Sequence, residues 1–154
     1  MGKAFYNPYF YSIKLTIMMM TQQPATIQLY QILGELFYAI AASDKVVRPA
    51  EIKAMRDLVN EKWKALDHLE DEYHTDAAYQ IEIVFDWLDD QYLDPEDCFQ
   101  DFKDFKKEHP KLFTLKIKKL IWETANAIAG SFAGLNKSEL AMLAKLKMNL
   151  EDDA

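Results

Sequence analysis

The sequence predicts an all-α protein, a compact multi-helix bundle built from two similar helical hairpins with two further helices between them. Apolar residues recur at helical spacing through most of the chain. The 154 residues include only five Pro and four Gly, so long irregular segments are not expected. Two segments, about 29–62 and 117–150, also match each other at a constant offset of 88 residues. With half its residues apolar, the chain has enough core for one domain at 25–150.

Residues 1–24 form an extension ahead of this domain. Apolar and polar residues alternate over 11–18, which is the pattern of a β-strand. A lone strand leaves its backbone groups unpaired, so this one would form a homodimer by pairing with the same strand of a second copy. The other interpretation is a disordered leader, with Met18, Met19 or Met20 as the natural start.

The first hairpin is expected to begin after Pro24. The apolar face of its first helix comprises Leu29, Leu33, Phe37 and Ile40. Residues 43–45 end that helix, and Pro49 takes a first helical position, where its missing N–H costs nothing. The apolar stripe of the second helix continues through Met55 and Trp63 to about Leu66.

Two helices are predicted between the hairpins, after a polar connector at 67–75. Thr75 is the expected cap of the first, whose buried side chains are Ile81, Val84 and Leu88. The second begins at Asp94 and Pro95, an acidic cap followed by proline. It carries Phe99, Phe102 and Phe105 on its apolar side.

The second hairpin is expected to have helices that start after Thr114 and Asn136, separated by a turn at 130–134. Asn136 and Glu139 have the spacing of a capping box. The matches to the first hairpin include Ile40–Ala41 with Ile128–Ala129, Glu51 with Glu139, Leu33 with Ile121, Ile52 with Leu140, and Met55 with Leu143. We therefore predict that the two hairpins pack face to face around one interior, followed by an acidic tail at 151–154.

The turn of the first hairpin carries Ala39-x-Ala41-x-x-Asp44-Lys45-x-Val47-x-x-x-Glu51. This resembles the A-x-A-D-G-x-(V/I)-x-x-x-E turn of the TerB-like tellurite-resistance family, which also occurs in the N-terminal domain of membrane-anchored DnaJ-type co-chaperones. The resemblance covers about residues 25–150. It implies an all-helical bundle, a stress-response or membrane-proximal setting, and a divalent-metal site formed by the acidic turn residues.

The chain departs from that pattern at two positions. Lys45 stands where the family has Gly, so a side chain must be accommodated where a positive φ is expected. In the second hairpin, Phe132 stands at the position that matches Asp44. A metal site that draws on both turns would therefore lose one of its acidic residues.

Two interpretations of the acidic turn residues remain open. As ligands, Asp44, Glu51 and Glu139 would bind Ca²⁺, Mg²⁺ or Mn²⁺, because these ions prefer oxygen ligands. As structural residues, both glutamates occupy the third position of a helix and can bond back to free backbone N–H groups. Asp44 can likewise satisfy donors within its own turn.

The other conspicuous feature is an acidic segment. Between Asp67 and Glu108, fifteen acidic residues face three lysines, a net charge of −12 in a chain whose total is −7. The predicted acidic face comprises Glu82, Asp86, Asp89, Asp90, Asp94, Asp97, Asp101 and Asp104. Such a face repels nucleic acid and attracts a basic protein segment. The alternative is a solvated face that keeps the protein soluble.

The sequence contains little that suggests catalysis. His68, His74 and His109 are scattered, and neither a phosphate-binding loop nor a nucleophile motif is present. Cys98 is the only cysteine, which excludes an internal disulfide. No apolar run reaches the length of a membrane helix, and we expect a cytoplasmic location.

These observations predict a non-catalytic interaction or stress-response module that requires no cofactor. It would bind a protein partner through a helical groove or the acidic face. The alternative function is divalent-metal binding through Asp44 and Glu51.

Overall fold

The computed structural model describes residues 24–66, 76–131 and 134–152. Its elements are α2 (Ala25–Ala41), α3 (Pro49–Leu58), the π-helix η2 (Val59–Trp63), α4 (Lys64–Leu66), the 3₁₀-helix η3 (Ala77–Tyr79), α5 (Gln80–Gln91), α6 (Pro95–Glu108), the 3₁₀-helix η4 (Pro110–Leu112), α7 (Leu115–Ala129) and α8 (Lys137–Glu151). These described residues contain no strand, which confirms the all-α prediction. The strand predicted at 11–18 lies outside them.

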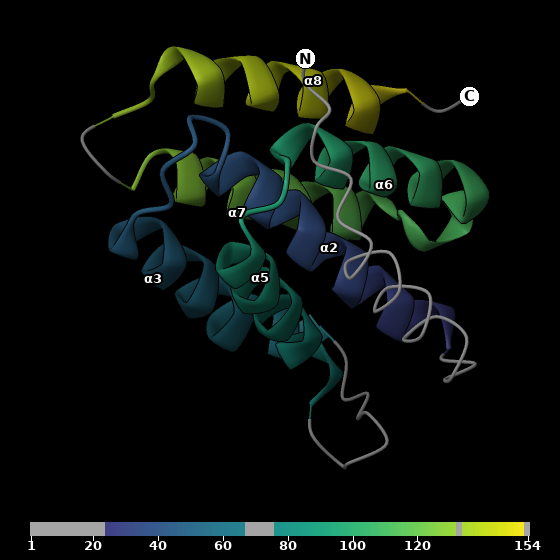
Figure 1. Cartoon of the computed structure of the whole chain (residues 1–154). Helices are drawn as coiled ribbons and strands as arrows, with labels where there is room; N and C mark the ends of the chain where they lie inside the picture. The colour runs from purple at the N-terminus through teal and green to yellow at the C-terminus, as the bar shows by residue number, and fades with distance from the viewer. Residues whose placement is uncertain (1–23, 67–75, 132–133, 153–154) are drawn as a thin grey trace.

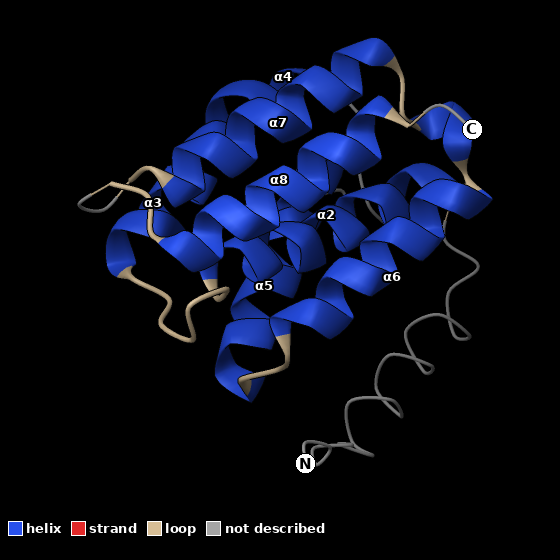
Figure 2. Cartoon of the chain, turned by 90° about the horizontal axis from the view of Figure 1, so that it is seen from above, coloured by secondary structure: helices blue, strands red, loops and turns tan. Residues whose placement is uncertain are grey.

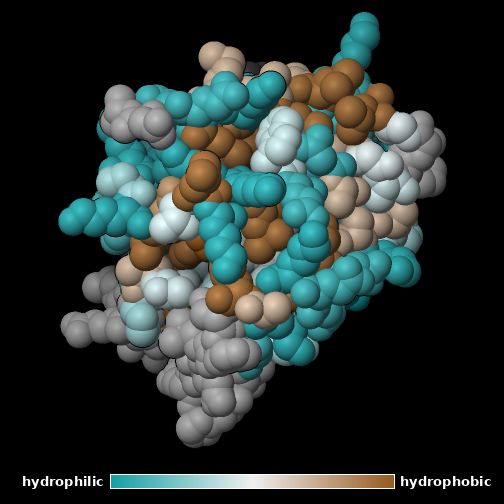
Figure 3. Space-filling model, turned by 180° about the vertical axis from the view of Figure 1, so that it is seen from behind, coloured by the Kyte–Doolittle hydropathy of each residue, from teal (hydrophilic) through white to brown (hydrophobic). Residues whose placement is uncertain are grey.

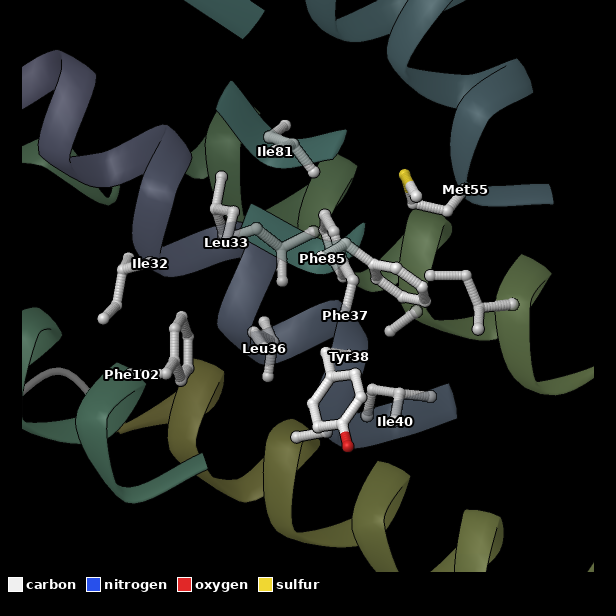
Figure 4. Close-up of a cluster of buried hydrophobic side chains, with 14 of the residues drawn as sticks. Ile32, Leu33, Leu36, Phe37, Tyr38, Ile40, Met55, Ile81, Phe85 and Phe102 are labelled. Carbon is white, nitrogen blue, oxygen red and sulfur yellow. The ribbon is translucent and has the colours of Figure 1, made fainter. Parts of the chain in front are cut away.

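Helix α2 runs through the middle of the bundle, with other helices on every side (Figure 1). Thirteen of its seventeen residues are buried, and they point in all directions around its axis. A helix that is apolar all round is typical of a buried position rather than of a surface. Figure 4 shows side chains from α2, including Leu33, Leu36 and Phe37, beside Ile81 and Phe85 of α5.

The two hairpins pack on each other as predicted. Helix α3 has its most extensive contacts with α7 rather than with its own hairpin partner α2, and α2 contacts both α7 and α8. Helices α5 and α6, which lie between the hairpins in sequence, pack extensively on α2. Leu33, Met55, Ile121 and Leu143 all belong to one hydrophobic core.

One of the predicted core matches is wrong. Leu140, paired in the repeat with Ile52, is half exposed, and Ile52 is only partly buried. The inner face of α8 is formed by buried residues at helical spacing, namely Glu139, Leu143, Leu146 and Leu150. Leu140 therefore lies on the outer side of the helix. The repeat therefore preserves apolar character at this position without preserving burial.

The second helix of the first hairpin contains a π-helical turn that the sequence pattern did not reveal. The turn ends at Trp63, which is fully buried. The Trp63 indole Nε1 donates a hydrogen bond of 3.0 Å to Thr124 Oγ1 on α7, and its ring meets Tyr30 edge-on. The tryptophan thus joins α2 and α7 through both its apolar ring and its polar N–H.

Aspartates cap the N-termini of the segments that begin α5 and α6. The Asp76 carboxylate accepts from the N–H of Ala78 at the start of η3, so Asp76 is the cap that the structure shows before α5. Thr75, predicted for this role, lies outside the described residues. Asp94 caps α6 as predicted, accepting from the N–H of Glu96 at 3.0 Å.

Within the described residues, no helix combines the length and apolar character that crossing a membrane requires.

Gly34 lies at a close contact between α2 and α5. A Cβ atom there would lie 2.7 Å from the Ile81 carbonyl oxygen and 2.8 Å from Val84 Cβ. Gly34→Ala is therefore expected to lower the free energy of unfolding by about 1–3 kcal/mol through overpacking, although alanine is the better helix former. Chemical denaturation measures this change. Gly130→Ala is the control, since its Cβ meets only the Asn126 carbonyl at 3.2 Å. Equal stability of the two variants would contradict the prediction.

Candidate functional site

The turns of the two hairpins meet at a polar cluster, here called the turn junction, which consists of Asp44, Arg48, Glu51, Asn136 and Glu139. Asp44 and Arg48 belong to the turn between α2 and α3, Glu51 to the first turn of α3, and Asn136 and Glu139 to the start of α8. The Asn136 amide Nδ2 donates a hydrogen bond of 2.8 Å to Asp44 Oδ2, across 92 positions of sequence. The repeat therefore brings its two equivalent turns side by side.

Asp44 organises the first turn. Its Oδ1 accepts from the N–H of Val46 at 3.1 Å, and its Oδ2 lies 2.9 Å from Nη1 of Arg48. Lys45, between these residues, has φ +73°, the left-handed conformation expected where the resembled family has Gly. The hydrogen bonds confirm that Asp44 satisfies donors within its turn.

Glu51 and Glu139 make equivalent capping bonds in the two hairpins. Glu51 Oε1 accepts from the N–H of Arg48 at 2.8 Å, and Glu139 Oε2 accepts from the N–H of Asn136 at 3.1 Å. In the second hairpin, Asn136 Oδ1 completes the box by accepting from the N–H of Glu139 at 2.9 Å. The capping interpretation of both glutamates is thus confirmed. Both are also buried, with 0% and 2% of their surface exposed.

The two glutamates face each other across the junction. Burial raises the pKa of Glu51, the N–H of Arg48 opposes that rise, and a hydrogen bond and like charge from Glu139 add to it, giving a pKa of about 7. Glu51 Oε2 finds no fixed N–H or O–H donor among the described residues. Because its pKa is raised, the Glu51 carboxyl holds its proton up to a higher pH than an ordinary glutamate does.

The turn junction holds a positive charge beside the carboxylates that were predicted to bind a divalent metal. The Arg48 guanidinium already lies 2.9 Å from the Asp44 carboxylate and 3.6 Å from Glu51 Oε2. A dication placed between these carboxylates would be repelled by that positive charge. Nowhere in 24–66, 76–131 and 134–152 do three or more His, Cys, Asp or Glu side chains form a group that could hold a metal ion. Metal binding by Asp44, Glu51 and Glu139 stays a prediction.

The residues of the predicted acidic face have different surroundings in the structure. Glu82 and Asp86 form ion pairs with Arg56, and the other acidic residues lie at the end of α5, at the N-cap of α6 and within α6. On α5, Glu82 and Asp86 are both engaged by Arg56 of α3, at 3.4 Å and 2.8 Å. This part therefore joins α3 to α5. Toward the end of α5, burial raises the pKa of Asp89, and the charges of Asp90 and Asp86 raise it further. On α6, Asp97, Asp101 and Asp104 follow Asp94 at helical spacing.

The connection between α5 and α6 carries a feature that the sequence interpretation missed. Tyr92 follows α5 with φ +53°, a left-handed conformation in which Gly is the usual residue, and 87% of its surface is exposed. We call Asp89, Asp90, Tyr92 and Asp94 the acidic corner, since all four belong to the end of α5 or to its connection with α6. In the sequence, this feature could have been recognised from a tyrosine that lies between Asp89–Asp90 and the capping residue Asp94.

Tyr38 of α2 contacts the backbone of the connection that carries the acidic corner. Its hydroxyl donates a hydrogen bond of 2.9 Å to the Leu93 carbonyl oxygen. Burial raises the pKa of Tyr38, and the nearby Cys98, Asp89, Asp94 and Tyr92 raise it further. The Tyr38 hydroxyl thus ties α2 to the backbone between Tyr92 and Asp94.

A shallow cavity of about 360 Å³ lies between the η2–α4 segment and α7. It is lined by Glu61, Lys62, Ala65, Leu66, Lys116, Lys119, Leu120 and Glu123. The ion pair between Lys62 and Glu123 crosses this lining. None of the predicted site residues lies there.

No protein-family model, no curated protein and no solved structure matches this chain. The resemblance to the TerB-like family therefore stays a sequence-based prediction.

The raised pKa of Glu51 predicts a specific dependence of stability on pH. Because the folded-state pKa is about 7 and the ordinary value is 4.5, the folded protein binds the proton more tightly than the unfolded chain. This stabilisation is complete below pH 4.5 and is lost as the pH rises to about 7. Relative to Glu51→Gln, the wild type is therefore expected to lose on the order of 2–3 kcal/mol over this range.

Urea denaturation of both proteins across these pH values tests this. Glu96→Gln, which alters an exposed ion pair with Lys145, is the control and should follow the wild type closely. Parallel stability curves for wild type and Glu51→Gln would contradict the raised pKa of Glu51.

A second prediction concerns divalent ions. Because Arg48 supplies the positive charge beside Asp44, EDTA and millimolar Ca²⁺, Mg²⁺ or Mn²⁺ are expected to leave the Tm of the wild type unchanged. Thermal unfolding followed by circular dichroism measures this. A cation-dependent rise in Tm that disappears in Asp44→Asn would instead establish the metal site.

Proposed function

We propose that this chain is a non-catalytic interaction module whose acidic face binds a Lys- and Arg-rich segment of another protein. The observation that carries this proposal is the acidic corner, where an exposed tyrosine stands among three aspartates. Aspartates supply ion pairs for the basic groups, and the tyrosine ring supplies a surface for a cation. The resemblance to the TerB-like family adds the expectation of a stress-response role, which stays a prediction.

The charge of the two helices supports electrostatic recruitment. Residues 80–108 contain ten acidic residues and three lysines, a net charge of −7 that equals the charge of the whole chain. Arg56 neutralises part of this charge at Glu82 and Asp86, on the side of α5 toward α3. The acidic corner lies beyond that pairing, at the other end of α5. A basic segment would therefore be attracted to the corner and the adjoining α6.

The conformation of Tyr92 supports a role in recognition. A non-glycine residue in the left-handed region costs about 1 kcal/mol, and an exposed ring returns little of this through packing. Residues that oppose stability without a structural benefit are commonly found at functional positions. Tyr92 fits this description because its ring is available to a partner while its backbone is strained.

Substitution of Tyr92 by glycine separates stability from binding. Tyr92→Gly is expected to raise the free energy of unfolding by about 1 kcal/mol, because glycine adopts φ +53° without strain. It is also expected to weaken binding of a fluorescent peptide of alternating Lys and Gly by roughly 3- to 10-fold, through loss of the cation–π contact. Fluorescence anisotropy measures the affinity, which should fall as the salt concentration rises.

Lys45→Gly is the matched control, because Lys45 has φ +73° and lies in the turn between α2 and α3 rather than in the acidic corner. It should raise stability in the same way and leave peptide binding unchanged. A peptide with Glu in place of Lys should not bind. Equal affinities of Tyr92→Gly and wild type, or binding that survives high salt, would contradict the proposed function.

A further inference from the structure

Helix α8 presents an apolar stripe to solvent. Leu140 is 50% exposed and Met148 is 72% exposed, although both belong to a helix whose opposite side lines the core. Ala144 lies between them and is also exposed, so the three residues follow one another at intervals of four, on one side of the helix. Ala141 is exposed beside them.

No other described element covers this stripe. Figure 2 looks down on α8 and shows its outer side open, with the described helices beside it and beneath it. In the view from behind, hydrophobic residues show at one end of the upper edge, beside hydrophilic ones (Figure 3). An apolar helix face that stays exposed indicates a surface for another molecule.

Helix α8 is fixed in place by side contacts that leave the stripe free. Lys145 Nζ lies 2.7 Å from Glu96 Oε1 of α6, and Lys106 Nζ of α6 donates to the Asp152 carbonyl oxygen at 3.2 Å. The turn junction fixes the start of the helix through Asn136. The stripe is therefore a preformed surface, which lowers the entropic cost of binding.

We propose that the outer face of α8 pairs with α8 of a second copy of this chain, in an antiparallel arrangement about a two-fold axis at Ala144. A two-fold axis there places residues equidistant from Ala144 opposite one another. Leu140 and Met148 are each four residues from Ala144. Leu140 of one copy therefore packs on Met148 of the other. The small Ala144 at the crossing allows the two helices to approach closely.

Charge complementarity identifies the second copy as the occupant. Lys137 and Glu151 each lie seven residues from Ala144, at opposite ends of α8 and on the same outer side. The two-fold axis places Lys137 of one copy against Glu151 of the other, and the same pair forms twice. Among the described residues, neither Lys137 nor Glu151 makes an ion pair within its own chain.

The size of this surface sets the expected strength. Two helices of fifteen residues are in contact over at most about 22 Å, so they bury less than the roughly 1,200–2,000 Å² of a standard stable interface. The dimer is therefore weak, and it forms at high concentration or where the chain is locally concentrated. This association differs from the predicted pairing of residues 11–18 and uses none of the acidic corner.

Sedimentation velocity of the full chain tests the proposal over roughly micromolar to millimolar concentrations. The wild type should show a monomer–dimer equilibrium, and Met148→Glu should raise the dissociation constant at least about tenfold by placing a charge in the apolar stripe. Leu115→Glu is the matched control, because Leu115 is 84% exposed on α7 and should leave the equilibrium unchanged. A monomer at every concentration, or a dimer insensitive to Met148→Glu, would overturn the proposal.

Charge reversal tests the antiparallel register. Lys137→Glu and Glu151→Lys should each weaken the dimer, and the double variant should restore it, since each pair then has its charges exchanged. Both substitutions suit the helix dipole of α8, so unfolding would not account for a loss of dimer. Failure of the double variant to recover would overturn the arrangement.

Cross-linking provides an independent measurement. Ala144→Cys should form a disulfide-linked dimer under oxidation, because the two copies of residue 144 meet at the axis. The native Cys98 is buried, with 1% of its surface exposed, and should not contribute. Absence of cross-linking in Ala144→Cys would overturn the two-fold axis proposed here.

Discussion

Burial of α2 on all sides is the constraint on which the rest of this structure depends. Most of its side chains are apolar and thirteen of its seventeen residues are buried, so it is stable in water only when other helices surround it. Helices α5 and α6 pack extensively on α2, and α7 and α8 contact it as well. The close approach of α5 at Gly34 belongs to the same requirement, because a larger residue would separate the two helices. Each hairpin therefore depends more on the other elements of the bundle than on its own turn.

The turn junction follows from packing two similar hairpins face to face. Each hairpin needs an acceptor for the free N–H at the start of its second helix, and Glu51 and Glu139 provide it. Because the turns meet, the two capping glutamates also meet, and both are buried there. Burial, and then the neighbouring Glu139 carboxyl group, raise the pKa of Glu51. Arg48 and Asn136 satisfy the remaining carboxylate, Asp44, and join the two turns.

The two proposed surfaces lie on different helices and have different chemistry. The acidic corner combines charge with an exposed ring at the end of α5, whereas α8 presents an apolar stripe with one charge at each end. Binding of a basic segment depends on salt, and pairing of α8 depends on burial of apolar area. A dimer formed through α8 would present two acidic corners, so a partner with repeated basic segments would gain from bivalent binding.

The sequence by itself determined the local structure. Apolar periodicity predicted the helices, Asp94 and Asn136 marked two of their starts, and the glycine position of the turn motif indicated the left-handed backbone that Lys45 adopts. The internal repeat predicted which hairpins pack together. These features depend on residues a few positions apart or on a pattern repeated along the chain.

Only the tertiary structure decided which side chains meet across the bundle. In the folded bundle, Glu51 lies near Glu139, and Arg56 forms ion pairs with Glu82 and Asp86. The π-helical turn that ends at Trp63 and the outward position of Leu140 are also visible only there. The physical reason is that burial and ion pairing depend on distances between residues far apart in sequence. Those distances are set by how whole helices pack.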